Sequence, residues 1–234
     1  HYALSQLEEV RRVLLVSGGL GETLVEVSKY APAEVDYVEL DPLLTRMAQE
    51  LGLIAWSPSL AMIHDDGRYY IKTSRKTYDA VIVDLPEPDT FQINRFFTSE
   101  FFALAKNVLE PGGVLSFSVE VAPNYLSDIQ RSKLSILYNT ASRHFRNVLI
   151  LPGEKAYFLC RDGDLWTDVP GRLALKSIPT SYLEGFYHGN VTRERMDALR
   201  EKLDPKAPIN TDFEPRIMNA LFQEWFTRHG SSPK

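Results

Sequence analysis

Short apolar runs alternate with amphipathic stretches between residues 12 and 161, and this alternation restricts the chain to few folds. The apolar runs are rich in Val, Ile and Leu, as strands buried on both faces of a parallel sheet are. The stretches between them have the length and pattern of helices. Repeated alternation of this kind predicts an α/β protein with a doubly wound, mostly parallel sheet. We expect strands over 12–17, 34–40, 60–65, 79–84 and 113–119, and helices over 21–30, 42–51, 67–74, 98–109 and 126–144.

The last two apolar runs of this region predict a hairpin. NVLILP (147–152) and AYFLCR (156–161) flank the turn-forming pair Pro152-Gly153. One antiparallel strand would then close an otherwise parallel sheet, which is a known variation on doubly wound sheets.

The pattern weakens after residue 161, although helices are expected over 192–203 and 214–227. We therefore divide the chain into a Rossmann-like catalytic domain, 1–161, and a small helical C-terminal extension packed on it, 162–234.

The composition excludes several classes of protein. No apolar run approaches the roughly 18 residues that a membrane-spanning helix needs, and the first residues have no signal-peptide pattern. A net charge of -5 provides no broad basic surface for nucleic acid. Cys160 is the single cysteine, and no Cys or His cluster has metal-ligand spacing. We expect a cytoplasmic protein that binds neither nucleic acid nor a metal.

The segment VSGGLGE (16–22) follows the first expected strand and precedes the first expected helix. Gly18, Gly19 and Gly21 allow a ligand to approach the main chain closely, and open α/β sheets bind ligands beyond the carboxyl ends of their strands. A dinucleotide site would need a third glycine where Leu24 stands, which argues against that class. Taken alone, the segment is also consistent with a tight turn that binds nothing.

Acidic residues follow the next strands at the same edge of the expected sheet. Glu39 ends the second strand and can accept hydrogen bonds from the ribose hydroxyls of a nucleoside. Asp66 can accept from an adenine amino group while the Gly67 amide meets a ring nitrogen, although helix capping is the alternative for Asp66. Asp84 ends the fourth strand, and Glu87 follows it in a proline-stiffened loop. Together they predict a nucleoside site with an acidic pocket at its reactive end.

These segments resemble the spermidine synthase family, aminopropyltransferases with a methyltransferase-type Rossmann fold. The similarity covers about 12–161, and it is strongest in VLLVSGGLGETLVEV, YVELDP, HDDGRYY, YDAVIVDLPEP and RFFTSEFFALAKNVLEPGGVL. DLPEP, NRFFTSEFF and INTDFEP (209–215) also resemble a bacterial branch that is often joined to membrane segments. The resemblance implies a homodimer, and the branch implies that this chain is the cytoplasmic part of a larger membrane protein.

The resemblance also implies a reaction, the transfer of an aminopropyl group from decarboxylated S-adenosylmethionine to a polyamine without a metal. Glu39 then matches the ribose-binding acid, and Asp66 and Gly67 match the adenine contacts. Asp84 matches the catalytic aspartate that opens the family's DxxDP motif. Glu87 replaces the second aspartate of that motif, which holds the acceptor amine, and it keeps the negative charge.

Two departures from the family pattern weaken this expectation. Leu20 stands where the family turn, GGGDGG, has an aspartate that helps hold the donor's ammonium. Loss of such a charge-assisted hydrogen bond costs about ten- to a hundredfold in affinity. The chain also begins after the family's N-terminal β-hairpin, which helps to cover the site and build the dimer, so we expect a pocket that lacks one wall.

Two alternatives stay open at this point. One is an S-adenosylmethionine-dependent methyltransferase, although Leu15 stands where these enzymes commonly carry an acid. The other is a non-catalytic nucleoside-binding domain of a membrane protein. Three further charged residues receive no role: Arg68 and Arg95 are expected to face solvent, and the sequence reveals no function for Asp212.

Overall fold

The computed structural model describes residues 1–18, 23–54, 57–122, 126–180, 183, 187 and 191–218. Its strands are β1 (Arg12–Val16), β2 (Glu34–Glu39), β3 (Leu60–His64), β4 (Tyr78–Val83), β5 (Leu109–Glu120), β6 (Asn147–Leu151) and β7 (Lys155–Arg161). Its helices are η1 (Leu4–Gln6), α1 (Thr23–Ser28), α2 (Pro42–Glu50), α3 (Gly67–Thr73), α4 (Phe91–Asn94), α5 (Ser99–Asn107), α6 (Asp128–Ser142), α7 (Val169–Leu175) and α9 (Arg193–Glu201).

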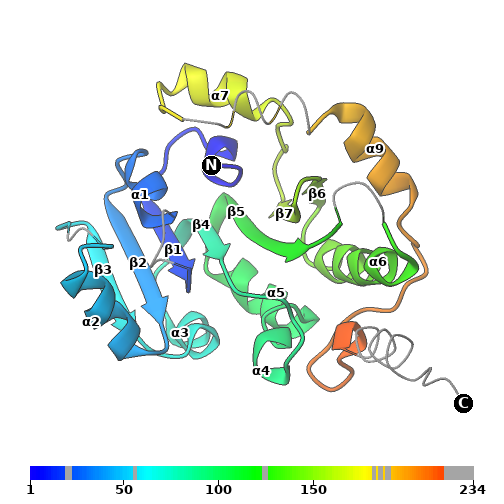
Figure 1. Cartoon of the computed structure of the whole chain (residues 1–234), viewed down its shortest axis with the longest axis horizontal. Coiled ribbons are helices and arrows are strands. Elements are labelled where there is room, and N and C mark those ends of the chain that lie inside the picture. Colours follow the sequence, from blue (N-terminus) through cyan, green and yellow to red (C-terminus); the bar gives the residue numbers. More distant parts are fainter. Residues whose placement is uncertain are drawn as a thin grey trace, which may run out of the picture.

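The strands form one 7-stranded sheet in the order β3-β2-β1-β4-β5-β7-β6. The first five strands of the chain pair in parallel, whereas β7 runs antiparallel to both β5 and β6. Figure 1 shows α1 and α7 on one side of the strands and α3 and α5 on the other. The predicted fold, a doubly wound and mostly parallel sheet with one antiparallel strand, is confirmed.

Buried side chains hold helices against both faces of the sheet. Leu14 and Val16 of β1 belong to the core that includes α3, α5 and α6, while Val13 belongs to the core that includes η1, α1 and α7. Successive side chains of a strand point to opposite faces, so an uninterrupted apolar run is what a strand covered on both sides requires. Stacked aromatic rings strengthen the first core, with the Phe117 and Phe158 centroids 4.6 Å apart.

One boundary differs from the sequence prediction. β5 already pairs with β4 at Leu109, four residues before the expected start. Between the Tyr78–Leu109 and Ala80–Val114 pairs the register shifts, because β5 carries extra residues there. Gly112, at φ +82°, lies in this irregular part. The Pro-Gly-Gly sequence thus interrupts the regular ladder without ending the strand.

The C-terminal residues contact the main sheet at several places. The predicted helix over 192–203 is confirmed as α9, whereas most of the helix predicted over 214–227 lies outside the described residues. α7 packs on η1, where Arg172 donates hydrogen bonds to the backbone carbonyls of Ser5 and Leu7. The division of the chain into two domains stays a prediction. In the part of the chain that the structure describes, no helix is long and apolar enough to cross a membrane.

The topology places the predicted site residues at one edge. β1 lies between β2 and β4, so the chain leaves β1 toward one side of the sheet and later returns to its other side. Such a reversal of strand order opens a crevice at the carboxyl ends of the strands, where α/β proteins bind ligands. Ser17 follows β1 there, Glu39 ends β2 and Asp84 follows β4.

Candidate functional site

The turn after β1 packs tightly against the end of β4. Gly18 has φ +71°, and a Cβ at this position would lie 2.2 Å from Oδ2 of Asp84. No larger residue fits between the turn and the Asp84 carboxylate, so a glycine is required here. Ser17 also has a positive φ, 61°. The predicted ligands Gly19 and Gly21 lie outside the described residues, and so does Leu20.

Glu39 is held in a cradle of hydrogen-bond donors. The residue is almost buried, at 8% exposure. Oε2 accepts hydrogen bonds from the Ser17 hydroxyl and the Tyr37 hydroxyl, both at 3.1 Å. Oε1 accepts from the backbone amides of Leu40 at 2.9 Å and Asp41 at 3.3 Å. These donors fix the direction of the carboxylate.

Asp66 caps α3 and forms an ion pair. Oδ1 accepts a hydrogen bond from the Tyr69 amide at 2.9 Å, and Oδ2 pairs with the guanidinium of Arg95. Burial alone would raise the pKa of Asp66, but the hydrogen bonds from Arg95 and Tyr69 outweigh it and hold the pKa below its ordinary value. Gly67 lies next to Val16, and a Cβ on it would come within 2.5 Å of Val16 Cγ1. The helix therefore starts close to the end of β1.

Glu39, Asp66 and Gly67 line one cavity of about 630 Å³. This volume lies in the range typical of small-molecule sites. The cavity opens at the carboxyl ends of β1 and β2, and the 85–96 segment forms its other wall. Its lining residues from that segment are Leu85, Pro86, Phe91, Gln92, Ile93, Arg95 and Phe96. The three residues predicted to bind ribose and adenine are thus brought together, and their binding role stays a prediction.

Asp84 lines a second cavity of about 250 Å³. Among the described residues, the carboxylate accepts one side-chain hydrogen bond, from the Thr23 hydroxyl at 3.1 Å. Ser116, Lys155 and Tyr157 line the same cavity. Burial and then the negative charge of Asp84 raise the pKa of Tyr157. Asp84 is therefore half-buried and shares the cavity lining with these polar groups.

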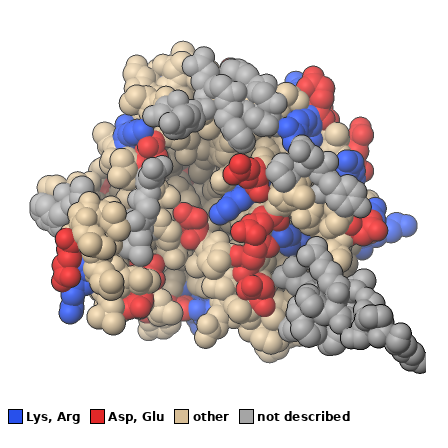
Figure 2. Space-filling view, in the orientation of Figure 1, with Lys and Arg blue, Asp and Glu red and all other residues tan. Residues whose placement is uncertain are grey.

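Glu87 is not among the described residues that line either cavity. Its Oε2 forms an ion pair of 2.6 Å with Nζ of Lys133 on α6, and the side-chain exposures are 19% for Glu87 and 5% for Lys133. Its Oε1 accepts a hydrogen bond from the Glu120 amide at the end of β5. Figure 2 shows acidic and basic side chains meeting in the middle of this face, over the ends of β4 and β5. The structure therefore places Glu87 apart from the other predicted site residues.

A family model matches most of the chain. Residues 1–153, more than half of the chain, match the model of the spermine/spermidine synthase domain. The chain belongs to this family. Among curated spermidine synthase relatives, a polyamine aminopropyltransferase of Prochlorococcus marinus (strain MIT 9215) is 33% identical over 146 residues, which cover 59% of this chain and 51% of that protein. Polyamine aminopropyltransferase 1 of Streptomyces coelicolor is 28% identical over 225 residues, covering 91% of this chain and 41% of that protein.

The chain spans about half the length of these curated relatives or less. A spermidine synthase solved in complex with the transition state analogue AdoDATO superposes with a TM-score of 0.68 and 22% identity, covering 87% of this chain and 72% of that one. Human methyltransferase-like protein 13, solved with SAH, gives a TM-score of 0.60 at 18% identity, covering 78% and 89%. At these identities the structures show the shared fold alone. The resemblance to the membrane-associated branch stays a prediction.

Sequence reasoning missed several partners of the candidate site residues. Ser17 adjoins the glycine turn, so its contact with Glu39 had a local signal. Arg95 was expected to face solvent, yet it lines the cavity and pairs with Asp66. Lys133 had no signal at all, because it lies 46 positions from Glu87 in the sequence. Among the described residues, no group of three or more His, Cys, Asp or Glu could hold a metal ion.

Proposed function

We propose that the chain transfers an aminopropyl group from decarboxylated S-adenosylmethionine to an amine nitrogen of a polyamine. One observation carries the proposal: Ser17 lines the cavity that holds Glu39 and Asp66, and the next residue, Gly18, packs against Asp84, which lines the second cavity. A nucleoside in the first cavity brings the substituents of its 5′ end toward the second. The names of the curated relatives, polyamine aminopropyltransferases, support the same reaction.

The donor site uses hydrogen bonds that the chain already orients. The Glu39 carboxylate accepts from ribose hydroxyls, and the Ser17 hydroxyl, which now occupies part of Oε2, can rotate away to make room. In this proposal Asp66 and the Gly67 amide meet the adenine edge. Since Glu39 and Asp66 are fixed by their own donors, little ordering is required when the donor binds.

Asp84 acts on the acceptor. A free amine is protonated near neutral pH, so a carboxylate that binds the ammonium both positions it and accepts a proton. The neutral nitrogen then attacks the methylene carbon beside the sulfonium. A C–N bond forms while the C–S bond breaks, and its electron pair returns to sulfur, which leaves as neutral methylthioadenosine. The product is a secondary ammonium, which carries the positive charge that the sulfonium has lost.

A direct test incubates the full-length protein with decarboxylated S-adenosylmethionine and a panel of diamines and polyamines. Release of methylthioadenosine together with an aminopropylated amine, measured by mass spectrometry, is the expected result. S-adenosylmethionine serves as the comparison donor, and Asp84→Asn as the inactive control. Methyl transfer from S-adenosylmethionine, or nucleoside binding without any turnover, would overturn the proposal in favour of one of the two alternatives.

Three features of the whole protein stay predictions from the sequence. They are a homodimer, a cytoplasmic location of this part, and membrane segments elsewhere in the full-length protein.

A further inference from the structure

The cavity lined by Glu39, Asp66 and Gly67 is called the donor cavity below. The segment over 209–214 lies beyond the residues that match the family model, yet it supports one wall of this cavity. Asn210 is fully buried, at 0% exposure. Its side-chain amide donates to Oδ1 of Asn94 and to the carbonyl of Phe97, both at 3.0 Å. The backbone carbonyl of Asn210 accepts a hydrogen bond from the backbone amide of Ser99 at 2.9 Å. These bonds fix the segment against the turn between α4 and α5.

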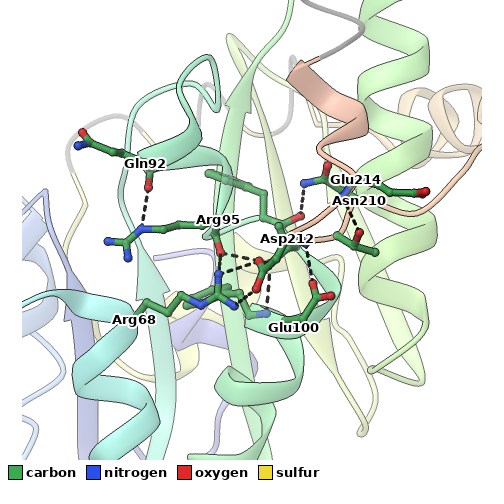
Figure 3. A network of polar contacts seen from close by, with 11 residues as sticks. Arg68, Gln92, Arg95, Glu100, Asn210, Asp212 and Glu214 are labelled. Carbon is green, nitrogen blue, oxygen red and sulfur yellow. Dashed lines mark hydrogen bonds and ion pairs between the residues drawn. The ribbon is translucent and has the colours of Figure 1, made fainter.

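Asp212 then contacts α3 and the start of α5 at the same time, as Figure 3 shows. Arg68 donates to both carboxylate oxygens, Nη1 to Oδ1 at 2.8 Å and Nη2 to Oδ2 at 2.5 Å. The Thr98 hydroxyl donates to Oδ1 at 2.8 Å. A two-pronged pair of this kind fixes direction as well as charge, and it is poorly screened because Arg68 and Asp212 are only 17% and 28% exposed. Burial would raise the pKa of Asp212, but the bonds from Arg68 and Thr98 lower it below its ordinary value.

Arg68 connects Asp212 to the residues that line the donor cavity. Its Nη1 also donates to the backbone carbonyl of Arg95 at 3.0 Å. Arg95 in turn donates from Nε to the carbonyl of Gln92 at 3.0 Å and pairs with Asp66 through Nη2. Gln92, Arg95 and Asp66 all line the donor cavity, whereas Asp212 does not.

We propose that Asp212 is a positioning residue for the donor cavity. It holds the Arg68 guanidinium, which holds the backbone of Arg95, so that the Arg95 side chain meets Asp66 in one orientation. The proposal rests on the proposed function, because that function places adenine against Asp66 and Gly67. It gives the INTDFEP sequence a physical role: the segment stabilises the adenine end of the site from outside it.

The test compares Asp212→Asn with wild type in the full-length protein. Asparagine keeps the shape of the side chain but removes its charge and one of the two oxygens that accept from the Arg68 guanidinium. Calorimetry with methylthioadenosine, at a temperature well below the unfolding midpoint of both proteins, should show about threefold to thirtyfold weaker binding. The KM for the decarboxylated donor should rise by a similar factor, while kcat at saturating donor is retained.

Glu214→Gln provides the matched control. It makes the same acid-to-amide change two residues away, where Glu214 forms an exposed pair with Arg216. We expect unchanged binding and kinetics for this variant. Arg68→Lys is the second test variant, because lysine keeps the charge but cannot form the fork. It should weaken nucleoside binding in the same direction, and it remains informative if Asp212→Asn does not fold.

Two failures can be told apart. If wild type binds methylthioadenosine and both Asp212→Asn and Arg68→Lys bind it equally well, losing only thermal stability, Asp212 is a structural brace and the inference is wrong. If wild type itself binds no nucleoside, the proposed function fails, and the inference fails with it.

Discussion

The cavity that holds Glu39 and Asp66 and the cavity that holds Asp84 differ in how many hydrogen bonds their carboxylates already accept. In the donor cavity, Glu39 accepts four hydrogen bonds from its own chain, and Asp66 has a backbone donor and a guanidinium. In the second cavity the described residues give the Asp84 carboxylate one side-chain donor, the Thr23 hydroxyl. Among the described residues, the carboxylates proposed to recognise the donor are thus fixed in advance, whereas Asp84, the proposed proton acceptor, has fewer side-chain donors.

Glu87 differs from both kinds of carboxylate. Its partner is an ammonium, as an acceptor amine would be, but that ammonium belongs to Lys133 and is nearly buried. The Ser17 hydroxyl can leave Glu39 by a single rotation, while Lys133 also donates to the Glu120 carbonyl at 2.7 Å. The chain therefore places a firmly held cation of its own on the acid that the family uses for the acceptor.

Asp84→Asn should give the largest effect and separate the two cavities most clearly. It keeps the size of the side chain and a partner for Thr23 but removes the proton acceptor. We expect kcat to fall by about 10²- to 10⁴-fold, the usual contribution of general acid–base catalysis, with methylthioadenosine affinity nearly unchanged. Methylthioadenosine release and calorimetry measure the two quantities. A large loss of nucleoside affinity would show that the cavities do not work separately.

Glu39→Gln, in the other cavity, should have the opposite effect: donor binding weakens and kcat is retained. The ionised carboxylate becomes a neutral amide with one acceptor oxygen, so hydrogen bonds from ribose lose their charge assistance. We expect about ten- to a hundredfold weaker donor binding, with kcat at saturating donor largely retained. Steady-state kinetics over a wide donor range gives both values. An unchanged donor KM would exclude Glu39 from the ribose site.

The sequence predicted the positions of these residues because local rules determine them. Apolar runs predicted the parallel strands. Parallel strands place Glu39 and the residue after β4 at a common edge of the sheet, and this placement does not depend on how other side chains pack. Gly18 had a local signal as well, since few residues fit a turn that touches the neighbouring strand.

The partners of those residues could not be predicted in the same way. Arg95 meets Asp66, and Lys133 meets Glu87, only after α4, α5 and α6 have packed on the sheet. Long charged side chains are usually solvated, so solvent was the reasonable expectation for Arg68 and Arg95. The contact of Asp212 with Arg68 spans 144 positions, which no short motif can encode.

Lys133→Gln tests the third carboxylate and should have a moderate effect. Glutamine can still donate a hydrogen bond to Glu87 but no longer neutralises it, so the carboxylate is free to pair with the far ammonium of a diamine that extends beyond the Asp84 cavity. We expect the KM for putrescine to fall by up to about tenfold, while the KM for butylamine, which has the same chain length and no second ammonium, stays unchanged. Kinetics with the two amines at saturating donor measures the ratio.

Glu87→Gln is the matched variant for that comparison. It leaves Lys133 in place, so it should not improve the use of putrescine over butylamine. Circular dichroism of both variants checks that loss of the buried pair has not unfolded α6, because breaking such a pair is often destabilising. An identical ratio in wild type and both variants would mean that Glu87 does not meet the acceptor.

The smallest expected effect concerns His144, which lies outside both cavities and limits the pH range over which they can be compared. Its Nε2 is 2.7 Å from the Ser99 hydroxyl. Burial and then the positive charge of Lys106 lower its pKa below the ordinary 6.5. The unfolded chain therefore binds this proton first as the pH falls below 6.5, so stability decreases from there down to the folded pKa and stays level below it.

His144→Gln should remove this dependence. Between pH 7 and pH 5 the thermal midpoint of wild type should decrease more than that of the variant. The difference should be no more than a few degrees, because His144 is half-exposed and solvent screens its charged neighbours. Thermal unfolding across that range measures it. Since the variant changes neither cavity, any pH dependence of transfer that it keeps belongs to Asp84 and the acceptor amine. Equal slopes in the two proteins would instead mean that His144 is as easily protonated in the folded chain as in the unfolded one.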